Sequence, residues 1–176
     1  MAKSKKTAKK SSRKRTGKRS ASSRGAPADA VALLKADHRQ VEAWFDEFEK
    51  SRSDTKKEEL ARKVCQALKV HTQIEEEIFY PAFLQATEDV DTHHEAEIEH
   101  EGAKRLIADI EASGPSDGYF DAKVKVLSEM IKHHVKEEEQ RDGMFAEARQ
   151  SSMDLKALGV ELASRKTALM QVSADS

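Results

Sequence analysis

The sequence predicts an all-α fold: an antiparallel up-down four-helix bundle with a short fifth C-terminal helix and a disordered basic N-terminal tail. Three observations support this prediction. Apolar residues recur every three or four positions through most of the chain after residue 30, which is the period of an amphipathic helix. The 176 residues include only 7 Gly and 3 Pro, and 36% are charged, as in a soluble helical protein. No segment shows the alternation of β-branched residues that a strand would require.

The first 26 residues form a low-complexity basic segment. Residues 1–25 hold 11 of the 31 Lys and Arg residues and no acid, which leaves 20 basic against 32 acidic residues, a net charge of −12, in the remainder. A segment of this composition cannot bury enough apolar surface to offset its loss of conformational entropy. We therefore expect a disordered basic arm attached to an acidic body.

Capping signals and the apolar period place the first two helices at about 29–51 and 55–86. Asp29 stands where the first helix should begin, and Ser53 is a suitable N-cap for the second. Pro81 lies inside the second helix, which is expected to be kinked there or to end, because proline removes a hydrogen bond and crowds the preceding turn.

Three further helices are expected at about 92–112, 119–150 and 153–170. The turn sequence Ser113–Gly118 separates the first two of these. Short loops between four long helices favour an antiparallel bundle, with the fifth helix packed outside it. The expected organisation is a basic tail at 1–26, a bundle at 27–150, and a C-terminal helix with a short tail at 151–176.

Composition also bears on cellular location. Cys65 is the single cysteine, so there is no internal disulfide framework and a reducing compartment is expected. No apolar run approaches the ~18–20 residues of a membrane span. A mitochondrial transit peptide is disfavoured, because Lys outnumbers Arg and no Leu, Ile, Val or Phe precedes Val31. The expected location is cytoplasmic, with nucleoid association if the basic arm binds DNA.

Each of the four long helices carries polar residues within its apolar stripe. A His and a Glu four residues apart share one helix face, and this pair occurs on two of the helices. Burying six such groups without partners would exceed a typical stability of about 5–15 kcal/mol, and a bound divalent cation would supply the missing charge. Six ligands suffice for two ions. The six candidate metal ligands are His38, His71, Glu75, His100, His134 and Glu138.

The donor types indicate the metal. Imidazole and carboxylate donors without thiolate favour iron or manganese over a structural zinc, and zinc is kept as an alternative. Glu75 and Glu138 are the natural bridges between two ions, with the histidines as terminal ligands. No catalytic nucleophile or phosphate-binding glycine loop is present, which disfavours a hydrolase.

Other acids and histidines lie near these positions. Glu97 or His93, one and two turns before the third-helix histidine, could complete the site. His133 and Glu137 repeat the His-x-x-x-Glu spacing on a less apolar face, and are expected behind the ligands or in solvent. Four further residues are expected on the solvent-exposed side: Glu76, Glu77, Glu139 and His94. Of these, Glu76 or Glu139 could reach a metal at the edge.

These phrases resemble the hemerythrin-like, HHE cation-binding family. The matching segments, within roughly residues 30–150, are Leu34–His38, His71–Pro81, Glu97–His100 and His133–Glu139. The resemblance implies a four-helix bundle with a non-heme, oxo- or hydroxo-bridged di-iron centre that binds O2 or related small ligands. It implies ligand roles for the six candidates named above. Ferritin-like proteins instead use paired Glu-x-x-His motifs, which occur here only at Glu97–His100.

Two departures from the family pattern affect the expected chemistry. Oxygen-carrying hemerythrins have a histidine where this chain has Ala96, and their fourth-helix carboxylate lies five rather than four residues after its histidine. A centre with fewer imidazoles should be less suited to reversible O2 carriage. Gln140–Gly143 resembles a short insertion, expected to form a bulge next to the site.

The sequence therefore supports two functions from different classes. The first is a di-iron protein that binds or senses O2, peroxide, NO or iron itself; any enzymatic activity would be peroxidase- or oxidase-like. The second is a nucleic-acid-associated protein whose arm, residues 3–24, contacts DNA or RNA phosphates nonspecifically. A solubilising tail is an equal alternative for the arm, and the absence of aromatic residues there argues against base stacking.

Overall fold

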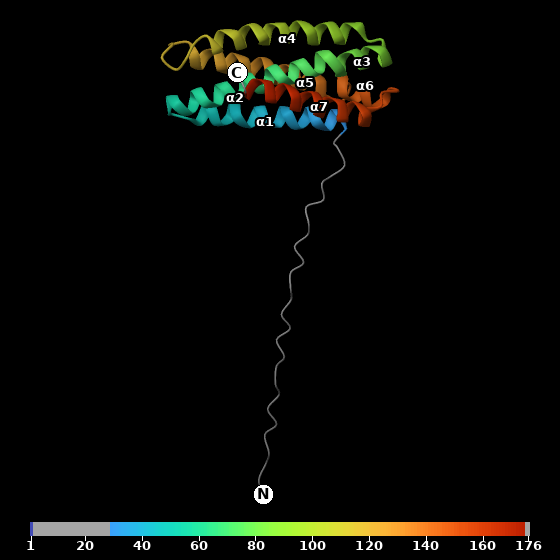
Figure 1. The fold of residues 1–176 in the computed structure, drawn as a ribbon, viewed down its shortest axis with the longest axis horizontal. Coiled ribbons are helices and arrows are strands. Elements are labelled where there is room, and N and C mark those ends of the chain that lie inside the picture. Colours follow the sequence, from blue (N-terminus) through green and yellow to red (C-terminus); the bar gives the residue numbers. More distant parts are fainter. Residues whose placement is uncertain (2–28, 175–176) are drawn as a thin grey trace.

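The computed structural model describes residues 1 and 29–174, and shows the latter as a bundle of long helices (Figure 1). The described residues contain no strand, as the sequence predicted. The expected tail at 1–26 lies outside these residues apart from Met1, so its disorder stays a prediction. The elements are α1 (Ala30–Lys50), α2 (Asp54–Ile74), the π-helix η1 (Glu75–Phe79), α3 (Tyr80–Thr87), α4 (Val90–Glu111), α5 (Phe120–Glu139), α6 (Met144–Gln150) and α7 (Leu155–Ala174).

The four bundle helices are α1, the continuous α2–η1–α3, α4 and α5. The starts of α1, α2 and α4 are set by side-chain caps that satisfy otherwise free backbone N–H groups. Asp29, Ser53 and Asp89 each accept a hydrogen bond from the N–H three residues later, at 2.8, 3.3 and 3.1 Å. Capping positions predicted from the sequence at Asp29 and Ser53 are therefore confirmed.

The second bundle helix contains a π-turn rather than a simple kink. In η1 the N–H of Tyr80 donates to the carbonyl of Glu75, five residues earlier. Pro81 follows at once, and a proline ring in a regular α-helix would crowd the carbonyl four residues before it. The widened turn accommodates the proline, and α3 continues to Thr87.

The π-turn adds one residue and so rotates the downstream helix face. An uninterrupted α-helix would have placed Ile78 and Ala82 in the core, but both are only partly buried. Phe79, Tyr80 and Phe83 are instead 0% exposed. The sequence also predicts Ile78 and Ala82 on the apolar stripe of this helix if its period of 3.6 residues stays constant, and that prediction is wrong beyond Glu75 because the π-turn changes the period.

The fourth bundle helix ends at Glu139, not near residue 150 as expected. The chain turns through residues 140–143 and starts the separate helix α6. A Cβ at Gly143 would collide with the backbone carbonyl of Glu137 and lie 2.9 Å from that of Glu138, so the turn requires glycine. The bulge expected after Glu138 is thus a helix end, and the bulge next to the site lies in η1.

The C-terminal helix α7 is longer than the predicted 153–170 and packs along α1, α2 and η1. Leu162 anchors it and is 0% exposed. Arg165 donates to both carboxylate oxygens of Glu77 at 2.6 and 2.9 Å. Lys166 forms an ion pair with Asp37 of α1. The helix therefore braces both the first bundle helix and the π-turn.

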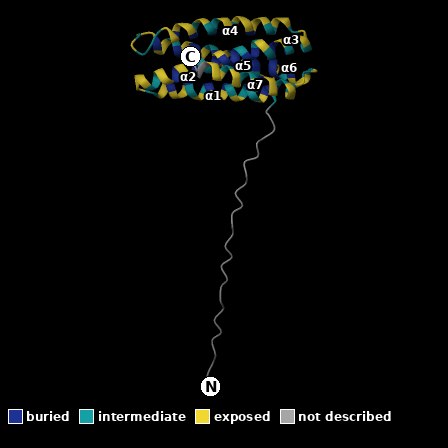
Figure 2. Ribbon diagram, viewed as in Figure 1, coloured by how far each residue is buried: buried dark blue, intermediate teal, exposed yellow. Residues whose placement is uncertain are grey.

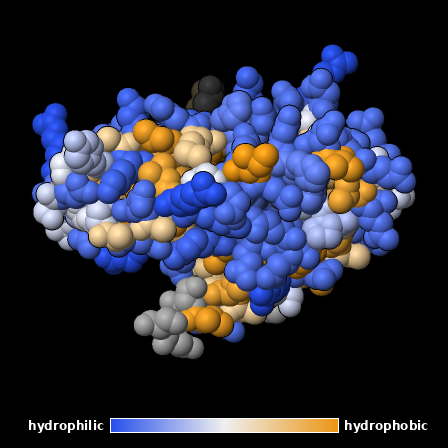
Figure 3. Space-filling model, turned by 90° about the horizontal axis from the view of Figure 1, so that it is seen from above, coloured by the Kyte–Doolittle hydropathy of each residue, from blue (hydrophilic) through white to orange (hydrophobic). Residues whose placement is uncertain are grey.

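Buried residues line the inside of the bundle (Figure 2) and form two separate apolar clusters. One includes Val41, Leu68 and Ile131, and the other includes Leu34 and Phe145. The six candidate ligands lie in the layer between them. The face in Figure 3 is mostly hydrophilic with small, separate apolar patches. None of the helices in the described part of the chain is long and apolar enough to cross a membrane.

Candidate metal centre

The structure brings all six candidate ligands to one level of the bundle. None is more than 5% exposed, and they come from all four bundle helices. Imidazole Nε2 atoms and carboxylate oxygens converge on a common interior region. The contributing residues are His38 of α1, His71 of α2, Glu75 of η1, His100 of α4, and His134 and Glu138 of α5.

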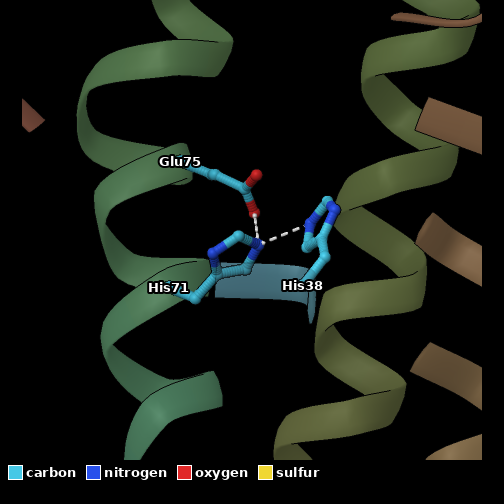
Figure 4. Close-up of side chains that lie close together, drawn as sticks. All are labelled: His38, His71 and Glu75. Atoms are coloured by element: carbon cyan, nitrogen blue, oxygen red, sulfur yellow. Dashed lines mark hydrogen bonds and ion pairs between the residues drawn. The ribbon is translucent and has the colours of Figure 1, made fainter. Parts of the chain in front are cut away.

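The imidazoles form two pairs. The Nε2 atoms of His38 and His71 lie 3.0 Å apart, and Glu75 Oε2 lies 3.2 Å from the latter nitrogen (Figure 4). The Nε2 atoms of His100 and His134 lie 3.3 Å apart. Each pair therefore presents two nitrogen donors to a common point.

Each buried carboxylate joins the two imidazole pairs. Glu75 Oε2 lies 3.5 Å from His100 Nε2 in addition to its contact with the first pair. Glu138 Oε2 lies 3.4 Å from His38 Nε2 and 3.7 Å from His134 Nε2. The site is thus two imidazole pairs spanned by two carboxylates, which is the arrangement expected for bridging ligands.

A second layer of acids faces the outer nitrogen of every imidazole. The Nδ1–carboxylate distances are 2.8 Å for His38–Glu139, 3.6 Å for His71–Asp37, 2.9 Å for His100–Glu76 and 2.7 Å for His134–Glu99. Such partners fix the ring orientation and direct the Nε2 lone pair inward. Three of these acids are themselves paired with cations, in the pairs Arg39–Glu139, Lys166–Asp37 and Lys104–Glu76.

Two residues of this layer correct the sequence-based expectation. Glu76 and Glu139 were expected on the solvated acidic face, whereas their side chains are 29% and 14% exposed and contact imidazoles. Glu77, in contrast, is exposed as expected and pairs with Arg165. The solvated-face assignment was wrong for the first two because Nδ1 partners lie on the flank of a helix stripe and not on its centre.

Tyr80 is a component of the site that sequence analysis missed. Its hydroxyl lies 3.1 Å from His100 Nε2 and 3.3 Å from Glu138 Oε1. Tyr80 follows Glu75 by five residues, a spacing that points away from the stripe in an α-helix but shares its face across a π-turn. In the sequence, only Pro81 indicated that the helix is irregular near Tyr80.

The buried acids resist ionisation. Burial raises the pKa of Glu75 well above its usual value, and the Glu138 carboxylate adds to that increase. Burial likewise raises the pKa of Glu138, and burial with the nearby carboxylates raises that of Tyr80. Within the described chain, both oxygens of Glu75 and Oε2 of Glu138 make no hydrogen bond. Such atoms are costly in a core unless a cation pairs with them.

The pKa values of the imidazoles shift in different directions. Burial lowers the pKa of His38 and lowers that of His100 to about 4, so both are neutral and offer a lone pair at pH 7. Burial also acts on His134, but the carboxylates of Glu138 and Glu99 outweigh it and raise its pKa. The neutral donors and unsatisfied oxygens fit the coordination preferences of a divalent transition metal.

The residues named as additional ligands lie apart from this layer. Glu97 is 52% exposed and contacts His93 Nδ1 at 3.6 Å. These two group with His94 on α4, outside the six. The ring of His93 packs against Tyr80 with centroids 5.9 Å apart. Buried Ala96 contributes no donor.

The helical bundle with its layer of inward-facing imidazoles and carboxylates defines the chain as an all-α metal-binding bundle protein. A family model for the hemerythrin HHE cation binding domain matches residues 29–146. The chain therefore belongs to this family, as the sequence motifs suggested, and HHE domains bind divalent cations.

Two individual proteins extend the comparison. A solved structure of a hemerythrin HHE cation binding domain-containing protein from Mycobacterium kansasii has a TM-score of 0.69 at 21% identity, covering 84% of this chain and 90% of that one. That likeness concerns the fold. A DNA nickase from Nostoc sp. (strain PCC 7120) is 31% identical over 107 residues. The match covers 61% of this chain and spans only 30% of that relative's length.

Proposed function

We propose that this protein binds two non-heme iron ions between its four bundle helices and uses them to bind or sense a small ligand such as O2, peroxide or NO. The observation that carries the proposal is the pair of buried carboxylates spanning two imidazole pairs. Their unsatisfied oxygens and the 3.2–3.7 Å separations from Nε2 atoms suit two ions sharing both carboxylates. The ligands proposed are His38, His71, Glu75, His100, His134 and Glu138.

The surrounding residues support this role by holding and shielding the centre. The outer acids fix the four rings from behind, so the Nε2 atoms need little reorganisation to bind a cation. Phe145 stacks on His38, with centroids 5.8 Å apart and planes within 10°, and covers one end of the layer with apolar surface. Bound iron would supply redox chemistry and coordination positions for a small ligand.

Tyr80 provides a proton at the edge of the centre. Its hydroxyl can donate to Glu138 Oε1, and its raised pKa keeps that proton on the oxygen at neutral pH. A hydrogen-bond donor in a buried site stabilises a polar or anionic ligand better than an apolar wall would. This feature favours a ligand such as peroxide over a purely apolar gas.

The proposal is tested by anaerobic iron loading followed by metal analysis and optical spectroscopy in air. The wild-type chain should retain about two iron ions and develop a visible charge-transfer band. His71→Ala should lose at least one ion, while His94→Ala, a substitution of an exposed histidine, should retain both. A colourless wild-type protein with less than one ion per chain would refute the proposal.

The same iron-loaded protein can be used to identify the small ligand and to test whether the ligand is consumed. Spectral changes on adding peroxide, NO or O2 identify which ligand reaches the centre. Peroxide consumption above that of the same amount of free iron, lost in His71→Ala, would assign a peroxidase-like activity. Spectral binding without consumption would assign a binding or sensing role.

A second candidate function is association with nucleic acid through the arm at residues 3–24. Two observations favour it: the concentration of 11 basic residues before residue 26, and the similarity to a protein described as a DNA nickase. Lys and Arg contacts with phosphates would be nonspecific and would weaken steeply with salt. A tethered metal centre could then act on, or protect, the bound nucleic acid.

This second function is tested with the full chain and a chain starting at Ala26. Gel shifts with duplex DNA and RNA at increasing salt should show binding by the full chain alone. Supercoiled plasmid, incubated with the metal-loaded protein, measures nicking directly. Equal binding by both chains would remove the arm from consideration.

A further inference from the structure

A second group of metal-type donors lies on the outer side of the bundle, between α4 and α5. Glu99 Oε1 lies 3.4 Å from His133 Nε2, and Glu137 Oε1 lies 3.2 Å from the same nitrogen. The three ligand atoms lie within 4.8 Å of one another. We call these three residues the outer cluster; their side chains are 25%, 62% and 40% exposed, so ions in solution can reach them.

The spacing of these atoms fits coordination of a small divalent cation. Carboxylate oxygens and imidazole nitrogens bind such ions at about 2.0–2.2 Å, so neighbouring donors on one ion lie ~3.0–3.4 Å apart. The two nitrogen–oxygen separations within the outer cluster are 3.4 and 3.2 Å. The donors also come from two helices, so they surround a point and do not merely lie along one face.

The charge of the outer cluster favours a divalent cation. Two carboxylates face a single imidazole, at 3.4 and 3.2 Å from its Nε2. A divalent cation would balance both carboxylate charges and take the imidazole nitrogen as a third donor.

The outer cluster is connected to the interior centre in two ways. Glu99 uses its other oxygen to bind His134 Nδ1 at 2.7 Å, so one carboxylate joins both sites. A cavity of about 190 Å³ is lined by Glu99 and His133 and also by the candidate inner ligands His100 and His134. The remaining lining is largely apolar, including Met130. A metal ion held at the outer cluster would therefore lie beside a cavity that also borders two of the candidate inner ligands.

We infer that Glu99, His133 and Glu137 form an outer binding site for a divalent cation, through which ions enter the interior centre. The binding site stands on its own geometry, whereas the loading role rests on the function proposed above. Glu99 would keep its hydrogen bond to His134 Nδ1 through Oε2 and release the ion from Oε1 as the ion moves inward.

Equilibrium dialysis with Zn²⁺ tests the site, using Glu137→Gln and the matched control Glu129→Gln on the exposed side of the same helix. The wild type and the control should bind one more ion per chain than Glu137→Gln. His133→Gln should lose the same ion. The difference between variants tests the outer site even if the interior centre binds no metal, because the total would then fall from one to zero instead of three to two. Equal stoichiometry in all four proteins overturns the inference.

Loading kinetics test the entry role. Metal-free protein is mixed anaerobically with limiting Fe²⁺, and the growth of the interior optical signal is followed after transfer to air. Glu137→Gln should load severalfold more slowly than Glu129→Gln, yet reach the same final iron content. Loading at the control rate by a variant that has lost the outer ion would overturn the entry role and leave the binding site.

Discussion

Replacing Glu75 by methionine should stabilise the metal-free protein and remove its stabilisation by metal. The carboxyl of Glu75 is 0% exposed and neither oxygen makes a hydrogen bond within the described chain. A methionine of similar length keeps the packing without leaving a polar group unsatisfied. The two imidazoles next to it retain other neighbours, since His71 Nε2 faces His38 at 3.0 Å and His100 Nε2 faces the Tyr80 hydroxyl at 3.1 Å.

The expected change in the free energy of unfolding has opposite signs without and with bound metal. An unsatisfied buried polar group costs about 1–3 kcal/mol, and a volume-conserving apolar replacement costs less than about 1.5 kcal/mol. Glu75→Met should therefore be more stable than the wild type by up to about 2 kcal/mol without metal. An ion present at ~1,000 times its dissociation constant stabilises the wild type by about 4 kcal/mol, and the variant that lacks the bridging carboxylate should lose most of this gain.

Thermal unfolding followed by circular dichroism, in EDTA and with excess Mn²⁺, measures both effects. At about 2–4 °C per kcal/mol, Glu75→Met should melt several degrees above the wild type in EDTA and several degrees below it with Mn²⁺. Glu129→Met, on an exposed position of α5, should follow the wild type in both. A Glu75→Met protein that melts lower than the wild type in EDTA, or that gains as much from Mn²⁺, would show that the buried carboxyl is not a strained metal ligand.

Three further outcomes are expected. Gly143→Ala should destabilise the protein by about 1–3 kcal/mol in urea unfolding, because its Cβ meets the carbonyls that end α5; Gly114→Ala, with no atom within 4 Å of its Cβ, should be near neutral. Tyr80→Phe should retain its metal content but bind peroxide more weakly in optical titrations, since only the donor hydroxyl is lost; unchanged affinity would exclude that role. Metal binding should release protons, because burial raises the pKa values of Glu75 and Glu138 and the metal requires their charged forms. A raised carboxyl pKa lowers stability as pH rises, and this cost is relieved as pH falls. Calorimetry in buffers of different ionisation enthalpy measures the proton release, and metal affinity should rise with pH.

The fold and the inner layer followed from local sequence rules, because a helix with a constant period presents the same face throughout. His38, His71, His100 and His134 each continued an apolar stripe, so their convergence required only that four such stripes face one core. The structure confirms the all-α bundle. It also brings the six named side chains together at one level.

The sequence-based predictions were wrong where the helical period changes and where contacts between distant segments determine the structure. Tyr80 was missed because the π-turn places it on the face of Glu75. The end of α5 was misplaced because the clash that requires Gly143 involves backbone carbonyls several residues earlier. The supporting role of Asp37 depends on its contact with Lys166 of α7, a pairing between distant segments that no single-helix pattern contains.

The polar layer also separates the interior into two apolar halves. One cluster lies toward Phe48 and Phe120, the other toward Phe83 and Leu162, and neither continues through the layer. Cooperative unfolding of the bundle therefore depends on the strength of the interactions between the four helices in the polar layer. With an ion ligated by all four helices the two ends should melt as one unit, whereas in chelator the end formed by α3 and α6 can open on its own and exchange its amide hydrogens first.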